Sequence, residues 1–246
     1  MTTSSLLRAL VLLTLGISGL SQAQMIPALV GDVGMAVYTT SPIARTADRH
    51  STLLPYVYAD FGPWYARVDT VGYKLLPMGA GHLELSARVS FEGYQSDNPG
   101  IGKRARPKPI GLGTFQKTPV GAFILYGFHD PVSSGSLIDA TYATKFTWGE
   151  LQVYPQIGIE RRDRKYVDHL YGIDASASLR SGLAVYAPGY SISPSTTLAV
   201  EYPLASNLKM TFQVRKKWMD NSIGESPLVD THQQTLTFLA ISRTFK

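Results

Sequence analysis

The sequence contains no cysteine, and beyond residue 20 it has no long apolar run. The first absence excludes a disulfide framework and a lipid anchor attached through cysteine, so stability must come from the fold itself. The second excludes a spanning helix, which needs about 20 continuous apolar residues. The one early apolar run, Ala9–Leu20, follows Arg8 and precedes Ser21-Gln22-Ala23, a pattern typical of a secretion signal. We expect this signal peptide, residues 1–23, to be removed.

The chain also lacks the common signatures of an enzyme or a metalloprotein. Its five histidines have no spacing typical of metal ligands, and no Gly-x-Ser-x-Gly elbow marks a serine hydrolase. His129-Asp130 beside Ser133 and Ser134 is the one crowded polar set near the end of an expected strand, and these residue types more often form a turn. Nothing resembles a nucleic-acid-binding module. We therefore expect no catalytic residue, no metal and no cofactor.

What the mature chain, residues 24–246, does contain is a regular alternation of apolar and polar residues. The segment His82–Tyr94 shows it most clearly, because Leu83 and Leu85 lie on one face and the charged Glu84 on the other. A period of two with one charged face is typical of a strand between lipid and a polar lumen. Similar segments cover residues 32–39, 53–60, 64–76, 110–117, 120–129, 136–148, 151–160, 197–204, 208–215 and 235–245.

Connection lengths favour a transmembrane antiparallel β-barrel over a soluble sandwich. Tight or short connections take turns with longer ones along the chain, which is the rhythm of outer-membrane barrels with short periplasmic turns and long outer loops. The tight or short connections are residues 77–81, 117–119, 148–150 and 205–207. The longer ones are residues 95–108, 130–135, 161–195 and 218–234. The chain is therefore predicted to be an all-β protein of the bacterial outer membrane.

The number of strands is open between twelve and ten. Eleven segments alternate, whereas single-chain bacterial barrels have an even number of strands. Either 64–76 folds back near Gly72 to give twelve, or 32–39 does not span and ten remain. We favour twelve. Pro155 interrupts one strand and removes a ladder donor, which suggests a bulge there.

Charged residues on the polar faces are candidates for lining the lumen. They are Glu84, Arg88, Glu92, Asp139, Lys145, Glu160, Glu201, Lys209 and Arg215. Both signs are present, so they either pair within a closed lumen or tune the selectivity of a pore. Because Glu84, Arg88 and Glu92 share one face of one expected strand, we hypothesise that Arg88 bridges the two carboxylates.

Basic clusters lie at or beyond the outer ends of the expected strands. They are residues 103–108, 161–165 and 215–217. Such clusters either bind the phosphates of lipopolysaccharide or simply remain solvated.

Short motifs, in order along the chain, resemble the MipA/OmpV family of outer-membrane proteins. The most specific lie in the long connection: Tyr171-Gly172-Ile173, Arg180-Ser181-Gly182-Leu183, Tyr186-Ala187-Pro188, and later Ser226-Pro227-Leu228-Val229. Further matches are Leu54-Pro55-Tyr56, Gly72-Tyr73-Lys74-Leu75 and Asp130 with Ser134-Gly135. The chain departs from the family at Leu170, where a tyrosine is usual, and at its end, where Lys246 follows Phe245.

The resemblance implies a non-enzymatic scaffold in the cell envelope. It implies interaction with the lytic transglycosylase MltA and with a bifunctional penicillin-binding protein during murein growth. Other members of the family are described as adhesins, which would use the opposite end of the barrel. Two readings from other classes remain open, a narrow channel for small solutes and an outer-membrane lipid hydrolase. The short periplasmic turns leave little surface for gripping two enzymes, which weakens the scaffold reading.

Overall fold

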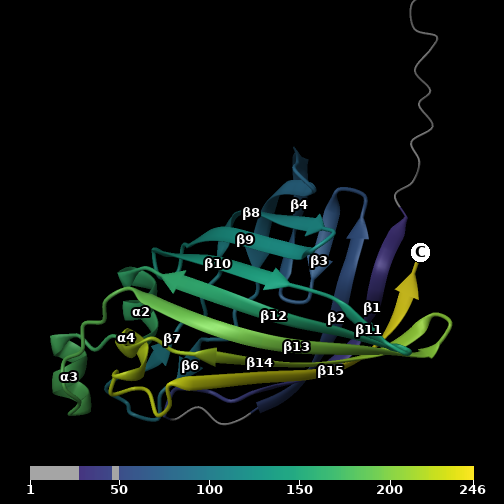
Figure 1. The fold of residues 1–246 in the computed structure, drawn as a ribbon. Coiled ribbons are helices and arrows are strands. Elements are labelled where there is room, and N and C mark those ends of the chain that lie inside the picture. The colour runs from purple at the N-terminus through teal and green to yellow at the C-terminus, as the bar shows by residue number, and fades with distance from the viewer. Residues whose placement is uncertain (1–27, 46–49) are drawn as a thin grey trace, which may run out of the picture.

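The computed structural model describes residues 28–45 and 50–246, which form one closed antiparallel β-barrel (Figure 1). Neighbouring strands pair along the chain, and the sheet closes because β1 pairs with β15 and β10 pairs with β12. The strands of the barrel are β1 (Leu29–Thr40), β2 (His50–Phe61), β3 (Trp64–Arg67), β4 (Thr70–Met78), β5 (Gly81–Arg88), β8 (Ile110–Thr118), β9 (Gly121–Asp130), β10 (Gly135–Ala143), β12 (Leu151–Arg162), β13 (Ser191–Ala205), β14 (Leu208–Trp218) and β15 (Gln233–Phe245).

The prediction of twelve strands is confirmed, but the predicted position of one turn is wrong. The segment 64–76 folds back at Val68-Asp69, not near Gly72. Val68 adopts a φ of 58°, which is rare for a β-branched residue and gives no sequence signal for a turn. Gly72 instead lies within β4, where a Cβ would sit 2.2 Å from the carbonyl oxygen of Leu85 and 2.6 Å from the Tyr65 hydroxyl. Its role is therefore close packing.

Pro155 coincides with an interruption of the neighbouring strand. Thr144 donates its N–H to the Pro155 carbonyl at 3.1 Å, but proline has no N–H to return. The chain leaves the ladder at this point and rejoins it as β11 (Phe146–Trp148), which pairs with β12 again. β10 and β11 therefore act as one interrupted strand of the barrel.

The two ends of the barrel differ in their connections. At one end, two-residue turns follow β2, β4, β8, β11 and β13. The other end carries α2 (Arg164–Tyr171), α3 (Ala175–Ser181), α4 (Asn221–Gly224) and the small hairpin of β6 (Tyr94–Gln95) and β7 (Lys103–Arg104) (Figure 1). Asp163, Asp174 and Asp220 cap these helices by accepting backbone N–H groups. In the described part of the chain, no helix is long and apolar enough to cross a membrane.

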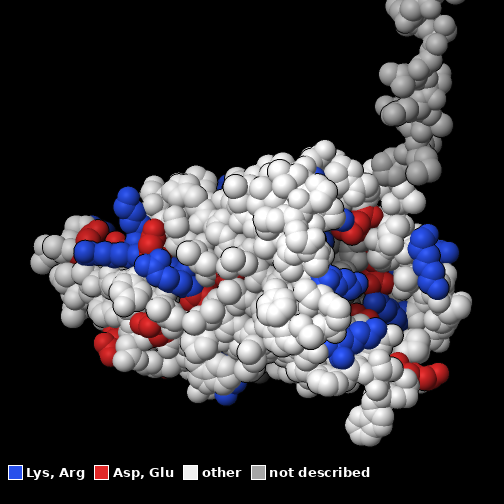
Figure 2. Space-filling model, turned by 45° about the horizontal axis from the view of Figure 1, so that its top comes forward, with Lys and Arg blue, Asp and Glu red and all other residues white. Residues whose placement is uncertain are grey.

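The outer wall is apolar across its middle. Figure 2 shows a broad band without charge between charged groups at the two ends. About half-exposed residues from six strands contribute to this wall, namely Val37, Leu85, Leu125, Ile159, Phe212 and Leu239. The expected alternation continues on the inner side, but the segment 82–94 is shorter than predicted because β5 ends at Arg88. Glu92 therefore lies beyond the strand.

Candidate functional site

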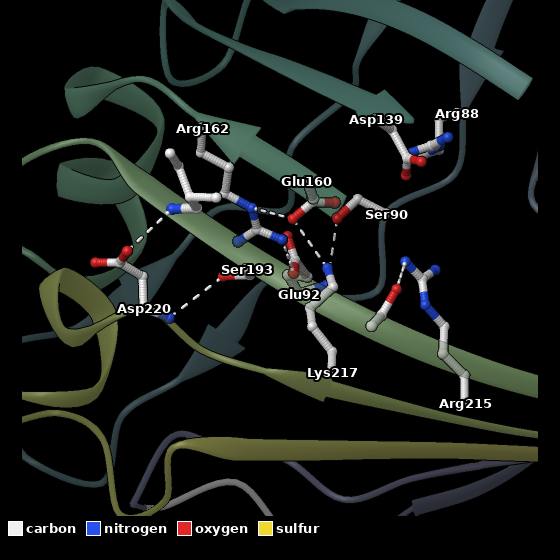
Figure 3. A network of polar contacts seen from close by, with 12 residues as sticks. Arg88, Ser90, Glu92, Asp139, Glu160, Arg162, Ser193, Arg215, Lys217 and Asp220 are labelled. Atoms are coloured by element: carbon white, nitrogen blue, oxygen red, sulfur yellow. Dashed lines mark hydrogen bonds and ion pairs between the residues drawn. The ribbon is translucent and has the colours of Figure 1, made fainter. Parts of the chain in front are cut away.

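The inside of the barrel holds a network of ion pairs centred on Arg162 (Figure 3). Arg162 is 2% exposed, and its Nε donates to Glu160 Oε1 at 2.6 Å while its Nη2 donates to Glu92 Oε1 at 2.5 Å. Lys217 Nζ lies 2.9 Å from the same oxygen of Glu160. The Arg162 guanidinium also stacks over the Tyr166 ring at 5.1 Å, which ties the network to helix α2.

Strand periodicity and small residues make room for this network. Glu160 and Arg162 are two residues apart on β12, so both project inward. Their neighbours on β13 are Ser193 and Ser191, which are almost fully buried and leave space for long side chains. Glu92 comes from the segment after β5, so the network joins opposite parts of the wall. A charge in this position needs a partner or water, and these residues supply partners to one another.

Arg88 lies in a second ion pair and does not bridge Glu84 and Glu92. Its Nη1 lies 2.9 Å from Asp139 Oδ2, and its guanidinium stacks over the Phe128 ring at 4.6 Å. The hypothesis of a bridge within one strand is therefore wrong. The reason is that the inner face of a closed barrel offers partners from other strands that are nearer than residues four positions along.

Glu84 forms a third cluster with residues from β3 and β9. Arg67 Nη1 lies 3.4 Å from Glu84 Oε1, and the Tyr126 hydroxyl donates to Glu84 Oε2. Tyr65 and Ser86 share a hydrogen bond beside this pair. Glu84 is 1% exposed, so its charge depends on these partners.

A fourth cluster lies toward the end of the barrel with the two-residue turns. Lys209 Nζ lies 2.6 Å from Asp32 Oδ2 and 3.0 Å from Glu201 Oε2. Lys74 Nζ lies 2.9 Å from Asp60 Oδ2. Ion pairs therefore occur along the lumen from the loop end to the turn end, with opposite charges matched at each level.

The nine lumen candidates fall into two groups. Seven form the ion pairs described above, namely Glu84, Arg88, Glu92, Asp139, Glu160, Glu201 and Lys209. Arg215 contacts only Ser195 Oγ, at 3.4 Å, among the hydrogen bonds of the described chain. Lys145 lies in the break between β10 and β11, where it is exposed and 5.8 Å from the Tyr154 ring.

Sequence reasoning missed Arg162 and Lys217, although both are central to the network. It assigned them to basic clusters in loops because runs of charge are usually solvated. The alternation of the strands identifies them, because residues two apart on a strand lie on the same face. Arg162 follows the lumen candidate Glu160 by two residues, and Lys217 follows the lumen candidate Arg215 by two residues. Extending the alternation through the charged runs would have placed both side chains inside the barrel.

Helix α2 closes the loop end of the lumen with an apolar cluster. Val167, Leu170 and Tyr171 are at most 3% exposed and pack against inward-facing residues that include Phe128 and Leu137. The Tyr94 hydroxyl donates to the Leu170 carbonyl at 2.8 Å, and burial raises the pKa of Tyr94 to about 12. The lumen is therefore covered at this end by ordered helix and side chains.

The family-like motifs build this cover. Gly172 ends α2 and its carbonyl accepts from Arg104 Nη2 at 2.5 Å, while Gly182, with a φ of 73°, ends α3. Ser226 Oγ donates to the Tyr171 carbonyl at 2.7 Å, and the Tyr186 hydroxyl donates to the Ser222 carbonyl at 3.1 Å. The remaining motif residues lie on the same connections: Arg180, Ser181, Pro188 and Pro227. These positions hold the loops together, since the contacts they make are with other loop residues.

The polar set near residue 130 forms a turn. Asp130 accepts the N–H of Lys108 at 2.6 Å and the N–H of Ser133 at 2.7 Å. The His129 ring lies 3.5 Å from Ser136 Oγ and makes no hydrogen bond to Ser133 or Ser134 in the described chain. Within residues 28–45 and 50–246, no group of three or more His, Cys, Asp or Glu side chains is arranged to hold a metal.

A family model described as "MltA-interacting protein MipA" matches residues 33–245 of the chain. The chain is 23% identical over 218 residues to YiaT of Escherichia coli (strain K12), which carries a provisional name as an outer membrane protein; the match covers 85% of this chain and 88% of YiaT. It is 28% identical over 113 residues to the MltA-interacting protein of the same strain, covering 46% of each chain. Among solved structures it is similar to the anion-selective porin from Comamonas acidovorans, with a TM-score of 0.35 and 9% identity over 88% of this chain and 98% of the porin.

Proposed function

The chain belongs to the MltA-interacting protein MipA family, and we propose that it is a closed interaction protein of the outer membrane that binds a lytic transglycosylase. The protein is an outer-membrane β-barrel, and its apolar wall is the surface that lipid covers. The observation that carries the proposal is the obstructed lumen. Ion pairs cross it at several levels and an apolar cluster covers one end, which favours a barrel that presents surfaces and does not transport.

The partner enzyme is expected at the end with the two-residue turns. A lytic transglycosylase acts on murein, so its partner surface on a barrel must face the periplasm. Trp148 is 80% exposed at the turn after β11, and Val120 is 68% exposed at the turn after β8. Exposed aromatic anchors are common at protein interfaces. We propose that this rim and the adjoining wall contact the enzyme, and that a penicillin-binding protein joins through the enzyme instead of through a second surface of the barrel.

The loop end supports a separate contact with lipopolysaccharide. Arg161 lies near the Tyr190 ring at 5.5 Å and is exposed, and Arg106 has no ion-pair partner in the described chain. Exposed guanidinium groups at the outer leaflet suit phosphate groups. We also propose that residues 1–23 are a cleaved signal peptide; residues 1–27 lie outside the described residues. If cleavage follows Ala23, N-terminal sequencing of the mature protein should give Gln24 as the first residue.

Crosslinking in native envelopes followed by purification of the barrel tests the proposal. Lytic transglycosylases should be enriched over an unrelated outer-membrane barrel prepared in the same way. Planar-bilayer recording of the purified protein tests the closed lumen, and the expected result is no stable conductance. Large open-channel currents with no enrichment of murein enzymes would instead support the narrow channel for small solutes.

A further inference from the structure

One side of the barrel wall is incomplete in its outer half. β3 has four residues, and it pairs with β2 only from Tyr58 opposite Arg67 to Phe61 opposite Trp64. One more hydrogen bond joins the Val68 N–H to the Val57 carbonyl at 2.8 Å. Beyond it, no strand of the described chain pairs with this edge of β2, although β2 continues back to His50 along β1. Figure 1 shows the turn between β3 and β4 part-way along the barrel.

The backbone groups along this edge of β2 have no partner strand within the residues that the structure describes. The Val57 carbonyl points toward β3, so alternation directs the backbone groups of Pro55 and Leu53 to the same side. Pro55 has no N–H, which removes one donor from the edge. An open sheet edge at membrane depth is tolerated only where it is buried in protein or lines a water-filled cavity. This position therefore requires a cavity behind it.

A cavity of about 640 Å³ lies at this place, between the inner faces of β1, β2 and β15 and the segment that follows β5. Its inner wall includes Tyr38, Leu54 and Leu236, which belong to or pack against one apolar cluster. Its lining also includes polar and charged residues, namely Thr40, Thr52, Gln95, Gln234, Glu92, Asp97 and Arg106. The volume is in the range of sites for small molecules, and the lining combines an apolar cluster with polar and charged side chains.

The residues that flank the opening on the outer wall are apolar and exposed. Leu53 on β2 is 62% exposed, and Val89 and Phe91 beyond β5 are 50% and 46% exposed. Such residues belong to the zone that contacts hydrocarbon. On this side, the acyl chains of membrane lipids therefore lie next to the opening of the cavity.

We propose that the cavity is a lipid-binding site, which one acyl chain of a membrane lipid enters sideways between β2 and the end of β5. Recognition rests on contact of the acyl chain with the apolar residues of the lining, which include Tyr38, Leu54 and Leu236. The site is separate from the ion-pair network, although Glu92 borders both. It also does not depend on the proposed binding of a murein enzyme at the other end of the barrel.

Quenching of single tryptophans by brominated acyl chains tests the site. The three native tryptophans are replaced by Phe, and one Trp is introduced by Leu54→Trp in the cavity. Leu53→Trp, the next residue on the lipid side, is the positive control. Gln213→Trp, which points inward behind the complete wall of β13, β14 and β15, is the negative control. Each variant is refolded into phosphatidylcholine vesicles with plain or with 9,10-dibrominated acyl chains.

The expected result is that Leu54→Trp is quenched at least half as strongly as Leu53→Trp and several-fold more than Gln213→Trp. Quenching of Leu54→Trp no stronger than that of Gln213→Trp overturns the proposal and leaves a cavity filled by water. If Leu54→Trp fails to give a heat-modifiable folded band, Leu236→Trp replaces it, because Leu236 reaches the same cavity from β15. The same two outcomes decide the proposal for that variant.

Discussion

Removing the Arg162 guanidinium should destabilise the barrel more than removing any exposed cation. In Arg162→Ala, Glu160 keeps Lys217 at 2.9 Å, but Glu92 loses the guanidinium nitrogen at 2.5 Å. Breaking a buried ion pair from one side costs about 3–5 kcal/mol because a charge is left without a partner. Because Glu92 is 17% exposed and can recruit some water, we expect the lower end, a loss of about 3 kcal/mol in the free energy of unfolding.

Urea unfolding in lipid vesicles, followed by tryptophan fluorescence, measures this loss. The matched control is Arg45→Ala, because Arg45 pairs with Asp230 at 3.0 Å while both side chains are more than half exposed. An exposed pair contributes at most about 1 kcal/mol, so the control should change little. Adding Glu92→Gln to Arg162→Ala should recover part of the loss. Equal stability of Arg162→Ala and Arg45→Ala would refute the reasoning that the lumen charges depend on one another.

Three further predictions test other parts of the structure. Val214→Arg should lower the free energy of unfolding in lipid more than Gln213→Arg does, because a cation on the lipid face costs about 2–4 kcal/mol near the midplane; a reversed order would mean that the inward and outward faces of β14 are exchanged. Hydrogen bonds from the Ala177 N–H and from the Ser176 hydroxyl lower the pKa of Asp174. The stabilisation of α3 by this cap should therefore be fully present above the unfolded pKa of about 3.9. It should be lost as the pH falls through the lower pKa of the folded state. Hydrogen exchange in α3 should therefore accelerate in Asp174→Ala at neutral pH, and unchanged exchange would count against the cap. Trp148→Ser should reduce recovery of the crosslinked enzyme, whereas Trp218→Ser, at the loop end of β14, should not; equal recovery from both variants would remove the rim from the proposed interface.

The strands could be predicted because each strand position faces either lipid or lumen. Apolar residues therefore alternate with polar residues along the sequence. The pairing inside the lumen could not be predicted in the same way. Glu92 and Arg162 are 70 residues apart, and only closure of the barrel brings them together. Charge runs such as 161–165 also mislead, because a closed lumen accepts paired cations that would otherwise be read as solvated. The turn at Val68 gave no signal because its φ of 58° is unusual for valine.

The helical cover was only partly foreseeable. Family-like motifs identified the connection 161–195 as special, but its length alone suggested a loop. Asp163 and Asp174 are good capping residues, and each starts a helix of eight or fewer residues. Helices this short are not stable alone in water, so their formation depends on packing against the inner wall.

The seam between β1 and β15 fixes an order of events during assembly. Most other pairs join strands that are close along the chain, and they can form as local hairpins as soon as both strands exist. The seam joins residues 212 positions apart, as in the hydrogen bond from Thr244 Oγ1 to Asp32 Oδ1. Until the last strand arrives, both edges of the growing sheet carry unpaired backbone groups that hydrocarbon cannot satisfy. Assembly must therefore shelter the first strand for the whole time that the rest of the barrel takes to form.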